Sequence, residues 1–177
     1  MIMDSMKEEL SGNIALKFLP PFPTVLIGTG TGDDSNLITA AMLHVFSLDP
    51  PMLGTGISPK RHSFGLIKKH EEFTVNVPCS HQLDKILDCG KVSGKDVDKF
   101  EKFGLTKEKS DKISVPGIEE FPLVYECEVK EQFKTGDHVW FIGEVVNAKK
   151  SQDYKKEDTI LYWGGEFRKP GKDLQEE

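Results

Sequence analysis

The stretch that decides the fold is NLITAAMLHVFSLDPPMLGTGISPKRHS, which runs from Asn36 to Ser63. It holds two apolar, strand-like runs separated by a double proline. The second run ends in glycines and leads into a new segment that Ser58 opens. The first run, from Leu37 to Phe46, fits either a helix or a strand. We interpret it as a strand followed by a turn, because turn signals flank it on both sides.

The end of this stretch has the residue types of a phosphate site. Ser58 suits a helix N-cap and Pro59 suits the first helical position, so the sequence predicts a helix from here to about His70. Free backbone amides at the helix N-terminus, together with Lys60 and Arg61 in its first turn, would favour a bound phosphate. The alternative is a well-capped helix with solvated charges.

Composition limits the possible classes of protein. The chain has 177 residues, of which 37% are apolar and 29% charged, and its net charge is −6. We expect a single domain over 1–177, with a core at about 21–168 and a mobile tail at 169–177. The acidic charge disfavours general nucleic-acid or anionic-membrane binding. With no run of ~18 apolar residues and no signal-peptide pattern, we expect no membrane association and a cytoplasmic location.

Several common site chemistries find no support in the sequence. The cysteines Cys79, Cys89 and Cys127 form no C-x-x-C pair, so neither a disulfide framework nor a zinc site is predicted. Cys79 and His81 could supply two metal ligands, but the sequence shows no second pair, and we expect no metal. The glycine-rich run 28–32 has the wrong spacing for a dinucleotide fingerprint.

Short strands and a few helices make up the rest of the pattern. Strands are expected at 24–29, 52–57, 73–78, 123–130, 139–146 and 159–163, and helices or helical lead-ins at 4–18, 58–70, 80–90 and 96–103. Ser80 and Asp96 are the expected caps of the last two helices, and Glu126 is expected to face solvent. Because the helices gather in the middle of the chain, the sequence predicts a mainly β fold whose antiparallel sheet closes into a barrel.

Three other groups of polar residues are candidates for a binding site. Asn36 and Thr39, followed by small side chains, could border a flat polar heterocycle. The segments 93–99 and 136–138 each combine glycine with a titratable side chain. Each group also has a purely structural explanation. Asn36 and Thr39 could be a turn asparagine and a strand threonine, 93–99 a loop with a solvated lysine, and 136–138 a hairpin turn.

Eight short motifs follow one another in a characteristic order. They are Pro23-Thr24-Val25, Asn36-x-x-Thr39-Ala40, Ser47-x-Asp49-Pro50-Pro51, Ile57-Ser58-Pro59-x-Arg61-His62-Ser63, Glu72-Phe73-Thr74-Val75-Asn76-Val77-Pro78, Ser93-Gly94-x-x-x-Asp98-Lys99-Phe100, Gly136-Asp137-His138 and Ile142-Gly143-Glu144-Val145. Together, over about 21–165, they resemble the flavin reductase-like family of FMN-binding split-barrel proteins, in its flavoredoxin and archaeal ferric reductase branch.

The resemblance implies a Greek-key split β-barrel with peripheral helices, and a homodimer that holds FMN near its interface. For the phosphate it implies Arg61, His62 and Ser63, with help from the backbone of Gly56, Ile57 and Ser58. For the flavin ring it implies Asn36, Leu37 and Thr39, with Ser93, Gly94 and Lys99 approaching from the mid-chain helices. It also implies Asn76 near the ribityl chain or the strand beneath it, and His138 near the exposed face of the flavin or the nicotinamide.

The implied activity is that of an NAD(P)H-dependent flavin or ferric reductase. Hydride would pass from NAD(P)H to FMN, and electrons would then reach a flavin, ferric or protein acceptor. The candidate catalytic residues are Lys99, which would tune the flavin, and His138, which would place the nicotinamide. One alternative is an electron carrier with tightly bound FMN and no NAD(P)H activity of its own. The other is a structural barrel with an empty pocket.

Overall fold

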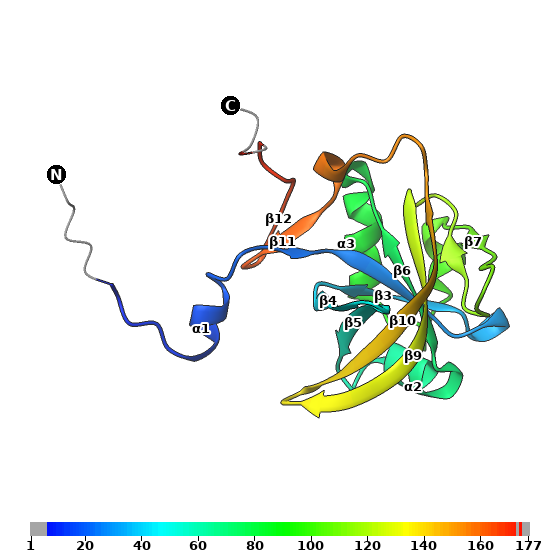
Figure 1. Ribbon diagram of the computed structural model, residues 1–177. Coiled ribbons are helices and arrows are strands. Elements are labelled where there is room, and N and C mark those ends of the chain that lie inside the picture. Colours follow the sequence, from blue (N-terminus) through cyan, green and yellow to red (C-terminus); the bar gives the residue numbers. More distant parts are fainter. Residues whose placement is uncertain (1–6, 173, 175–177) are drawn as a thin grey trace.

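The structure is a computed structural model that describes residues 7–172 and 174 (Figure 1). Within these residues, seven strands form one antiparallel sheet in the order β3-β2-β6-β9-β10-β5-β4. They are β2 (Val25–Thr29), β3 (Asn36–Ala40), β4 (Leu43–Leu48), β5 (Pro51–Ile57), β6 (Glu72–Val77), β9 (Leu123–Thr135) and β10 (His138–Lys150). Because β3 and β5 touch without being paired neighbours, the sheet curls into a barrel with an open seam. The predicted mainly β, antiparallel fold is confirmed.

Strand β2 is buried on both of its faces, which explains its uninterrupted apolar sequence. Successive side chains of a strand point to opposite faces. Ile27 therefore lies in the barrel core with Phe73, whereas Leu26 lies in a second core. There it packs with Ile86 of α3 (Leu83–Lys91) and Phe100 of α4 (Lys99–Phe103). The two helices are thus held against the outer face of the sheet beside β3.

Helix α2 (His62–His70) packs Ile67 into the barrel core, but it begins later than predicted. The N-cap is Arg61, because residues 58–61 form a turn in which the Arg61 N–H donates to the Ser58 carbonyl at 2.9 Å. The predicted Ser58 cap is therefore wrong. The helix ends at His70, as the sequence indicates, and Glu71 follows in a left-handed conformation with φ 53°.

The caps of α3 and α4 also differ from the prediction. A short 3-10 turn (Ser80–Gln82) precedes α3, and the Cys79 N–H donates to the Gln82 side chain at 2.8 Å, so Ser80 is not the cap. Helix α3 continues through Gly90. Helix α4 is capped by Asp98, which accepts from the Phe100 N–H at 2.8 Å, and not by Asp96.

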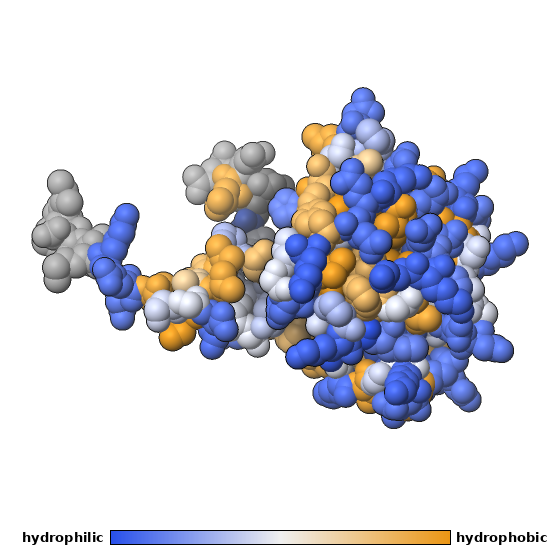
Figure 2. All heavy atoms as spheres, turned by 90° about the horizontal axis from the view of Figure 1, so that it is seen from below, coloured by the Kyte–Doolittle hydropathy of each residue, from blue (hydrophilic) through white to orange (hydrophobic). Residues whose placement is uncertain are grey.

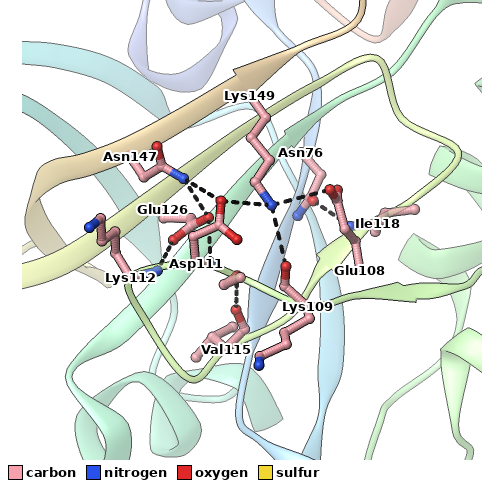
Figure 3. Close-up of polar contacts among 11 residues, drawn as sticks. Asn76, Glu108, Lys109, Asp111, Lys112, Val115, Ile118, Glu126, Asn147 and Lys149 are labelled. Carbon is pink, nitrogen blue, oxygen red and sulfur yellow. Dashed lines mark hydrogen bonds and ion pairs between the residues drawn. The ribbon is translucent and has the colours of Figure 1, made fainter.

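Glu126 of β9 is buried, although strand alternation predicts that it faces solvent. It is 1% exposed, because the loop 109–116 folds over this part of the sheet. Its carboxylate accepts from the backbone N–H groups of Asp111 at 3.0 Å and Lys112 at 2.7 Å, and from Asn147 at 2.9 Å (Figure 3). Burial alone would raise the pKa of Glu126, but these hydrogen bonds outweigh it and hold the pKa below its usual range.

The remaining elements are short. A three-stranded sheet pairs β1 (Phe22–Pro23), β11 (Leu161–Trp163) and β12 (Glu166–Arg168), and β7 (Lys107–Glu108) pairs with β8 (Gly117–Ile118). Single 3-10 turns lie at Gly32–Asp34 and Lys156–Asp158. The sequence does not predict β12. Among the described residues, no helix is long and apolar enough to cross a membrane.

The N-terminal segment contains less helix than the sequence predicts. Helix α1 (Gly12–Leu16) is the only part of the expected 4–18 helix among the described residues, and residues 4–6 lie outside them. Figure 1 shows this arm standing away from the barrel. Most of the predicted tail, 169–172 and 174, is described without regular structure, while 173 and 175–177 lie outside the described residues.

Candidate functional site

Two adjoining cavities, of about 440 and 460 Å³, open where β3 and β5 meet the start of α2 and the end of α3. They share Ile38, Thr39, Lys60 and Arg61, so we treat them as one groove. The remaining lining comprises His62, Ser63, Cys89, Gly90, Lys91, Val92, Ser93, Gly94, Asp96 and Lys99 on one side and Ala40, Ala41, Met42, Gly56, Ile57, Ser58, Asp137 and His138 on the other, with Asn36 at its inner end.

The groove brings together most of the residues that the sequence predicts for the site. These are Asn36, Thr39, Gly56, Ile57, Ser58, Arg61, His62, Ser63, Ser93, Gly94, Lys99 and His138. They come from five separate parts of the chain, which only the fold places side by side. Leu37 and Asn76 are not among the lining residues.

Asn36, the first residue of β3, has a buried oxygen without a partner. The side chain is 4% exposed, and its Nδ2 donates to Ser63 Oγ at 2.7 Å. Its Oδ1 has no hydrogen-bond partner among the described residues. Gly94 lies so close that a Cβ there would sit 1.9 Å from this oxygen. An unpaired buried acceptor lowers the free energy of unfolding by about 1–3 kcal/mol. A donor on a bound ligand would pair with Oδ1 and remove this cost.

The α2 end of the groove is cationic. Lys60 and Arg61 lie in the turn before the helix, and Lys91 approaches from the end of α3, on a chain whose net charge is −6. The first backbone amides of α2 lack intrahelical partners and carry the positive end of the helix dipole. Phosphate is therefore still the favoured ligand here, although Arg61 and not Ser58 begins the helix.

Lys99 is a buried cation fixed at the floor of the groove. It is 4% exposed, and its Nζ donates to the carbonyl oxygens of Leu37 and Cys89, both at 2.7 Å. An ammonium group has three N–H donors, so one remains for a ligand. Burial lowers the pKa of Lys99 below its usual value, and the nearby Arg61 lowers it further, while the Cys89 thiol acts in the opposite direction.

Leu37 takes part through its backbone alone. Its side chain is fully buried in the core between the sheet and α3, and only its carbonyl oxygen reaches Lys99. Thr39, two residues further along β3, donates to the Ile86 carbonyl at 2.7 Å and so ties the strand to α3. Both contacts fix the wall of the groove on the β3 side.

His138, the first residue of β10, lines the second cavity together with Asp137, Lys60 and Arg61. Its Nδ1 is 2.8 Å from Asp137 Oδ1. The hydrogen bond and charge of His138 lower the pKa of Asp137 below its usual value. This pairing holds the imidazole beside the cavity that Lys60 and Arg61 also line.

Asn76 does not reach the groove. It is 0% exposed, and its Nδ2 donates to the Leu26 carbonyl and to Thr74 Oγ1, both at 3.0 Å. Its Oδ1 accepts from the Ile118 N–H at 2.9 Å. These bonds hold β8 against the barrel and use the polar atoms of the amide. The expectation that Asn76 contacts a ligand finds no support in this geometry.

Sequence reasoning missed part of the lining. Cys89, Gly90 and Lys91 belong to the last turn of α3, which the sequence predicts only as a helix end. Burial raises the pKa of the Cys89 thiol to about 11, so the thiol is neutral. Only the position of this turn, immediately before the predicted Ser93-Gly94 loop, could have indicated from the sequence that it lines the groove.

The fold and the groove define an antiparallel split-barrel protein with a cationic cleft at its seam. The family model for the flavin reductase like domain matches residues 20–171. A protein of Pyrococcus abyssi without an assigned function is 37% identical over 141 residues, which is 80% of this chain and 78% of that protein. The chain therefore belongs to the flavin reductase-like family, as the resemblance of its motifs predicts.

Solved structures agree with this assignment. A flavoredoxin from Methanosarcina acetivorans superimposes with a TM-score of 0.84 and 26% identity, with 97% of each chain covered. An FMN-binding protein from Thermus thermophilus, solved with p-hydroxybenzaldehyde, gives a TM-score of 0.82 and 27% identity, with 98% of each chain covered. Both share the split-barrel fold of the chain.

Two features of the groove are complementary to a flavin nucleotide. Its cationic end, with Lys60, Arg61 and the first amides of α2, is complementary to a phosphate monoester. The unpaired Oδ1 of Asn36, in the same cavity and joined to the first turn of α2 by the hydrogen bond from Nδ2 to Ser63, is complementary to the single ring N–H of an isoalloxazine.

Proposed function

We propose that this protein binds FMN in the groove and acts as an NAD(P)H-dependent reductase of a flavin, ferric or protein acceptor. The unpaired, buried Oδ1 of Asn36, in the same cavity as Arg61 and Lys60, is the observation that carries the proposal. A groove that served only to close the barrel would not leave a buried acceptor unpaired beside several cations.

The phosphate end is assigned to Arg61, His62 and Ser63, with Gly56, Ile57 and Ser58 forming the adjoining wall. The Arg61 guanidinium can pair with two phosphate oxygens at once. Ser63 is 1% exposed and already accepts from Asn36, so it links the phosphate end to the ring end.

The ring end is assigned to Asn36, Thr39, Ser93, Gly94 and Lys99. Bound FMN would supply the redox chemistry, by accepting hydride from NAD(P)H and passing electrons to the acceptor. Lys99 is held by two backbone carbonyls, so its charge stays in place beside the ligand and favours electron uptake. No nucleophile or general base of the protein is required.

His138 is assigned to the nicotinamide. The cavity of about 460 Å³ that His138 lines adjoins the first cavity and leaves room for a second nucleotide next to the first. The pairing with Asp137 fixes the direction of the ring. In this role His138 orients the donor and transfers no proton.

We further propose that the active form is a cytoplasmic homodimer built from this one domain. β4 lies at the edge of the sheet and exposes apolar side chains, of which Leu48 is 87% exposed. Hydrophobic residues also lie along the N-terminal arm (Figure 2), including Ile14, Leu16 and Phe18. A second copy that covers these surfaces would remove them from water. Sedimentation of the purified protein tests this, and a monomer at micromolar concentration would contradict it.

The experiment that tests the function is anaerobic mixing of the FMN-loaded protein with NADH or NADPH. The proposal predicts rapid loss of the flavin's visible absorbance with at least one nucleotide, and far slower loss with free FMN. If FMN binds but bleaches only with a reduced redox protein, the chain is a carrier, the alternative that the flavoredoxin likeness favours. If FMN does not bind, the proposal is wrong.

A further inference from the structure

A second cluster of chemically reactive side chains lies outside the groove. Cys79, His81 and Asp158 each offer one ligand atom, and the three atoms all lie within 4.8 Å of one another. Cys79 and His81 come from the junction between β6 and α3, whereas Asp158 ends the 3-10 turn between β10 and β11. The fold therefore adds a third ligand from the C-terminal part of the chain, which the sequence pattern could not reveal.

The surrounding contacts hold the cluster in place. The Cys79 N–H donates to the Gln82 side chain, which fixes the start of the Ser80–Gln82 turn. Ser80, between the two ligands, donates its hydroxyl to Asp158 Oδ1 across 78 positions of sequence. The 151–160 segment is thus anchored to the β6–α3 junction before any ion is bound.

The ligand types favour one class of ion. A thiolate, an imidazole and a carboxylate are the three donors that Zn²⁺ accepts in tetrahedral sites, with water as a fourth ligand. Calcium and magnesium prefer oxygen ligands alone. Asp153 and Glu157 line the same cavity of about 520 Å³, together with Lys155 and Lys169.

A lysine already forms an ion pair with the carboxylate of this cluster. Lys169 lies 2.7 Å from Asp158 Oδ1, the same oxygen that accepts from Ser80. Neither contact involves Oδ2. An ammonium group beside Asp158 opposes a second positive charge, so Lys169 should weaken metal binding without preventing it.

We propose that Cys79, His81 and Asp158 form a zinc site that fastens the C-terminal segment to the junction of β6 and α3. Binding forms a sulfur–zinc bond, and the thiol proton passes to solvent. The site is independent of the proposed flavin function, because none of its ligands lines the groove.

The test uses Co²⁺ as a coloured substitute for Zn²⁺. Full-length protein freed of metal by chelation is titrated anaerobically with Co²⁺, and difference spectra against the metal-free sample cancel any flavin absorption. We expect a near-ultraviolet sulfur-to-cobalt charge-transfer band that saturates at one ion per chain and disappears when Zn²⁺ is added. No such band, or one that never saturates, would overturn the proposal.

Matched variants locate the site. Cys79→Ser should abolish the charge-transfer band, and His81→Ala or Asp158→Asn should weaken Co²⁺ binding at least tenfold. Cys89→Ser, which removes a buried thiol elsewhere, and His44→Ala, which removes an exposed imidazole, should leave the titration unchanged. Lys169→Met should tighten binding about two- to fivefold, because it removes the competing cation. A band that survives Cys79→Ser would contradict the assignment.

A measurement on the unmodified chain covers the case in which Cys79→Ser does not fold. Cys79 is half-buried, whereas Cys89 and Cys127 are buried, so an alkylating reagent should label Cys79 first. Micromolar Zn²⁺ should slow that labelling at least tenfold, as judged by mass spectrometry of the peptide. Equal labelling with and without Zn²⁺ would show that the three side chains form only the hydrogen-bonded junction.

Discussion

The side-chain amide of Asn36 donates a 2.7 Å hydrogen bond to Ser63 Oγ, which joins the start of β3 to the first turn of α2. The same side chain presents its unpaired Oδ1 against the backbone of Gly94. One residue thus connects the helix that would bind a phosphate with the loop that would cover a flavin ring. The following predictions test this arrangement.

Arg61→Ala should weaken FMN binding by about 1.5–3 kcal/mol, the scale of hydrogen bonds to a charged group, or roughly 10- to 150-fold in dissociation constant. The measurement is a titration of FMN fluorescence at fixed ionic strength. Lys68→Ala is the matched control, since it removes one exposed charge from the same helix but does not line the groove. Equal affinities for the two variants would refute the phosphate assignment.

Gly94→Ala should lower FMN affinity by about tenfold or more, equivalent to ~1.4 kcal/mol. The new Cβ would lie 1.9 Å from Asn36 Oδ1, so the amide or the loop must move out of position. Gly65→Ala is the control, because no atom lies within 4 Å of a Cβ there. It should leave binding unchanged and stabilise α2 by about 0.5–1 kcal/mol. Unchanged FMN affinity in both variants would show that Gly94 does not contribute to the binding site.

Lys99→Met should make the midpoint potential of bound FMN more negative by tens of millivolts. A unit charge about 4 Å from the ring is worth about 1 kcal/mol in water and about 4 kcal/mol at an effective dielectric constant near 20. The variant should also lose stability, since the Leu37 and Cys89 carbonyls lose their buried donor. Redox titration gives the potential, with exposed Lys95→Met as control. A potential equal to that of the control would leave Lys99 with a structural role only.

Glu126→Gln should lower the free energy of unfolding at pH 7 by about 1.5–3 kcal/mol, because the loop at 111–112 loses a charged acceptor. The lowered pKa of Glu126 means that the unfolded chain binds the proton more readily. This stabilisation is complete above the unfolded pKa of ~4.3 and is lost as pH falls through the folded pKa.

Urea unfolding at several pH values checks the Glu126 prediction. The original chain should lose stability more steeply below about pH 4.5 than the Gln variant does. Glu119→Gln, at an exposed position, is the control and should change stability by less than about 0.5 kcal/mol. Parallel pH curves for the original chain and Glu126→Gln would contradict the assignment.

Strand positions and fold class followed from local pattern, because alternation and turn residues act over a few neighbours. The interpretation of 37–46 as a strand followed by a turn is based on flanking turn signals. β3 confirms the strand, but a second strand, β4, begins at Leu43 where the turn was expected. The ordered family motifs predict Asn36, Arg61 and Gly94 as site residues, and all three line the groove.

The misses share a physical cause, since each depends on a contact distant in sequence. Glu126 faces a loop that returns from 111–112, so simple strand alternation assigns it to solvent. The role of Asn76 stays a prediction, since family motifs do not reveal that its amide bonds Leu26 and Ile118. Helix α2 starts at His62 because residues 58–61 form a turn, so that Ser58 does not cap the helix. Residue preferences alone do not decide between these two conformations.

The most direct measurement of the central claim is a crystal structure of the protein grown with FMN. The account predicts one FMN per chain in the groove, with its phosphate on Arg61 and the first amides of α2, and with a ring N–H donating to Asn36 Oδ1. A groove without FMN, or FMN bound with Asn36 Oδ1 still unpaired and Arg61 turned to solvent, would contradict it.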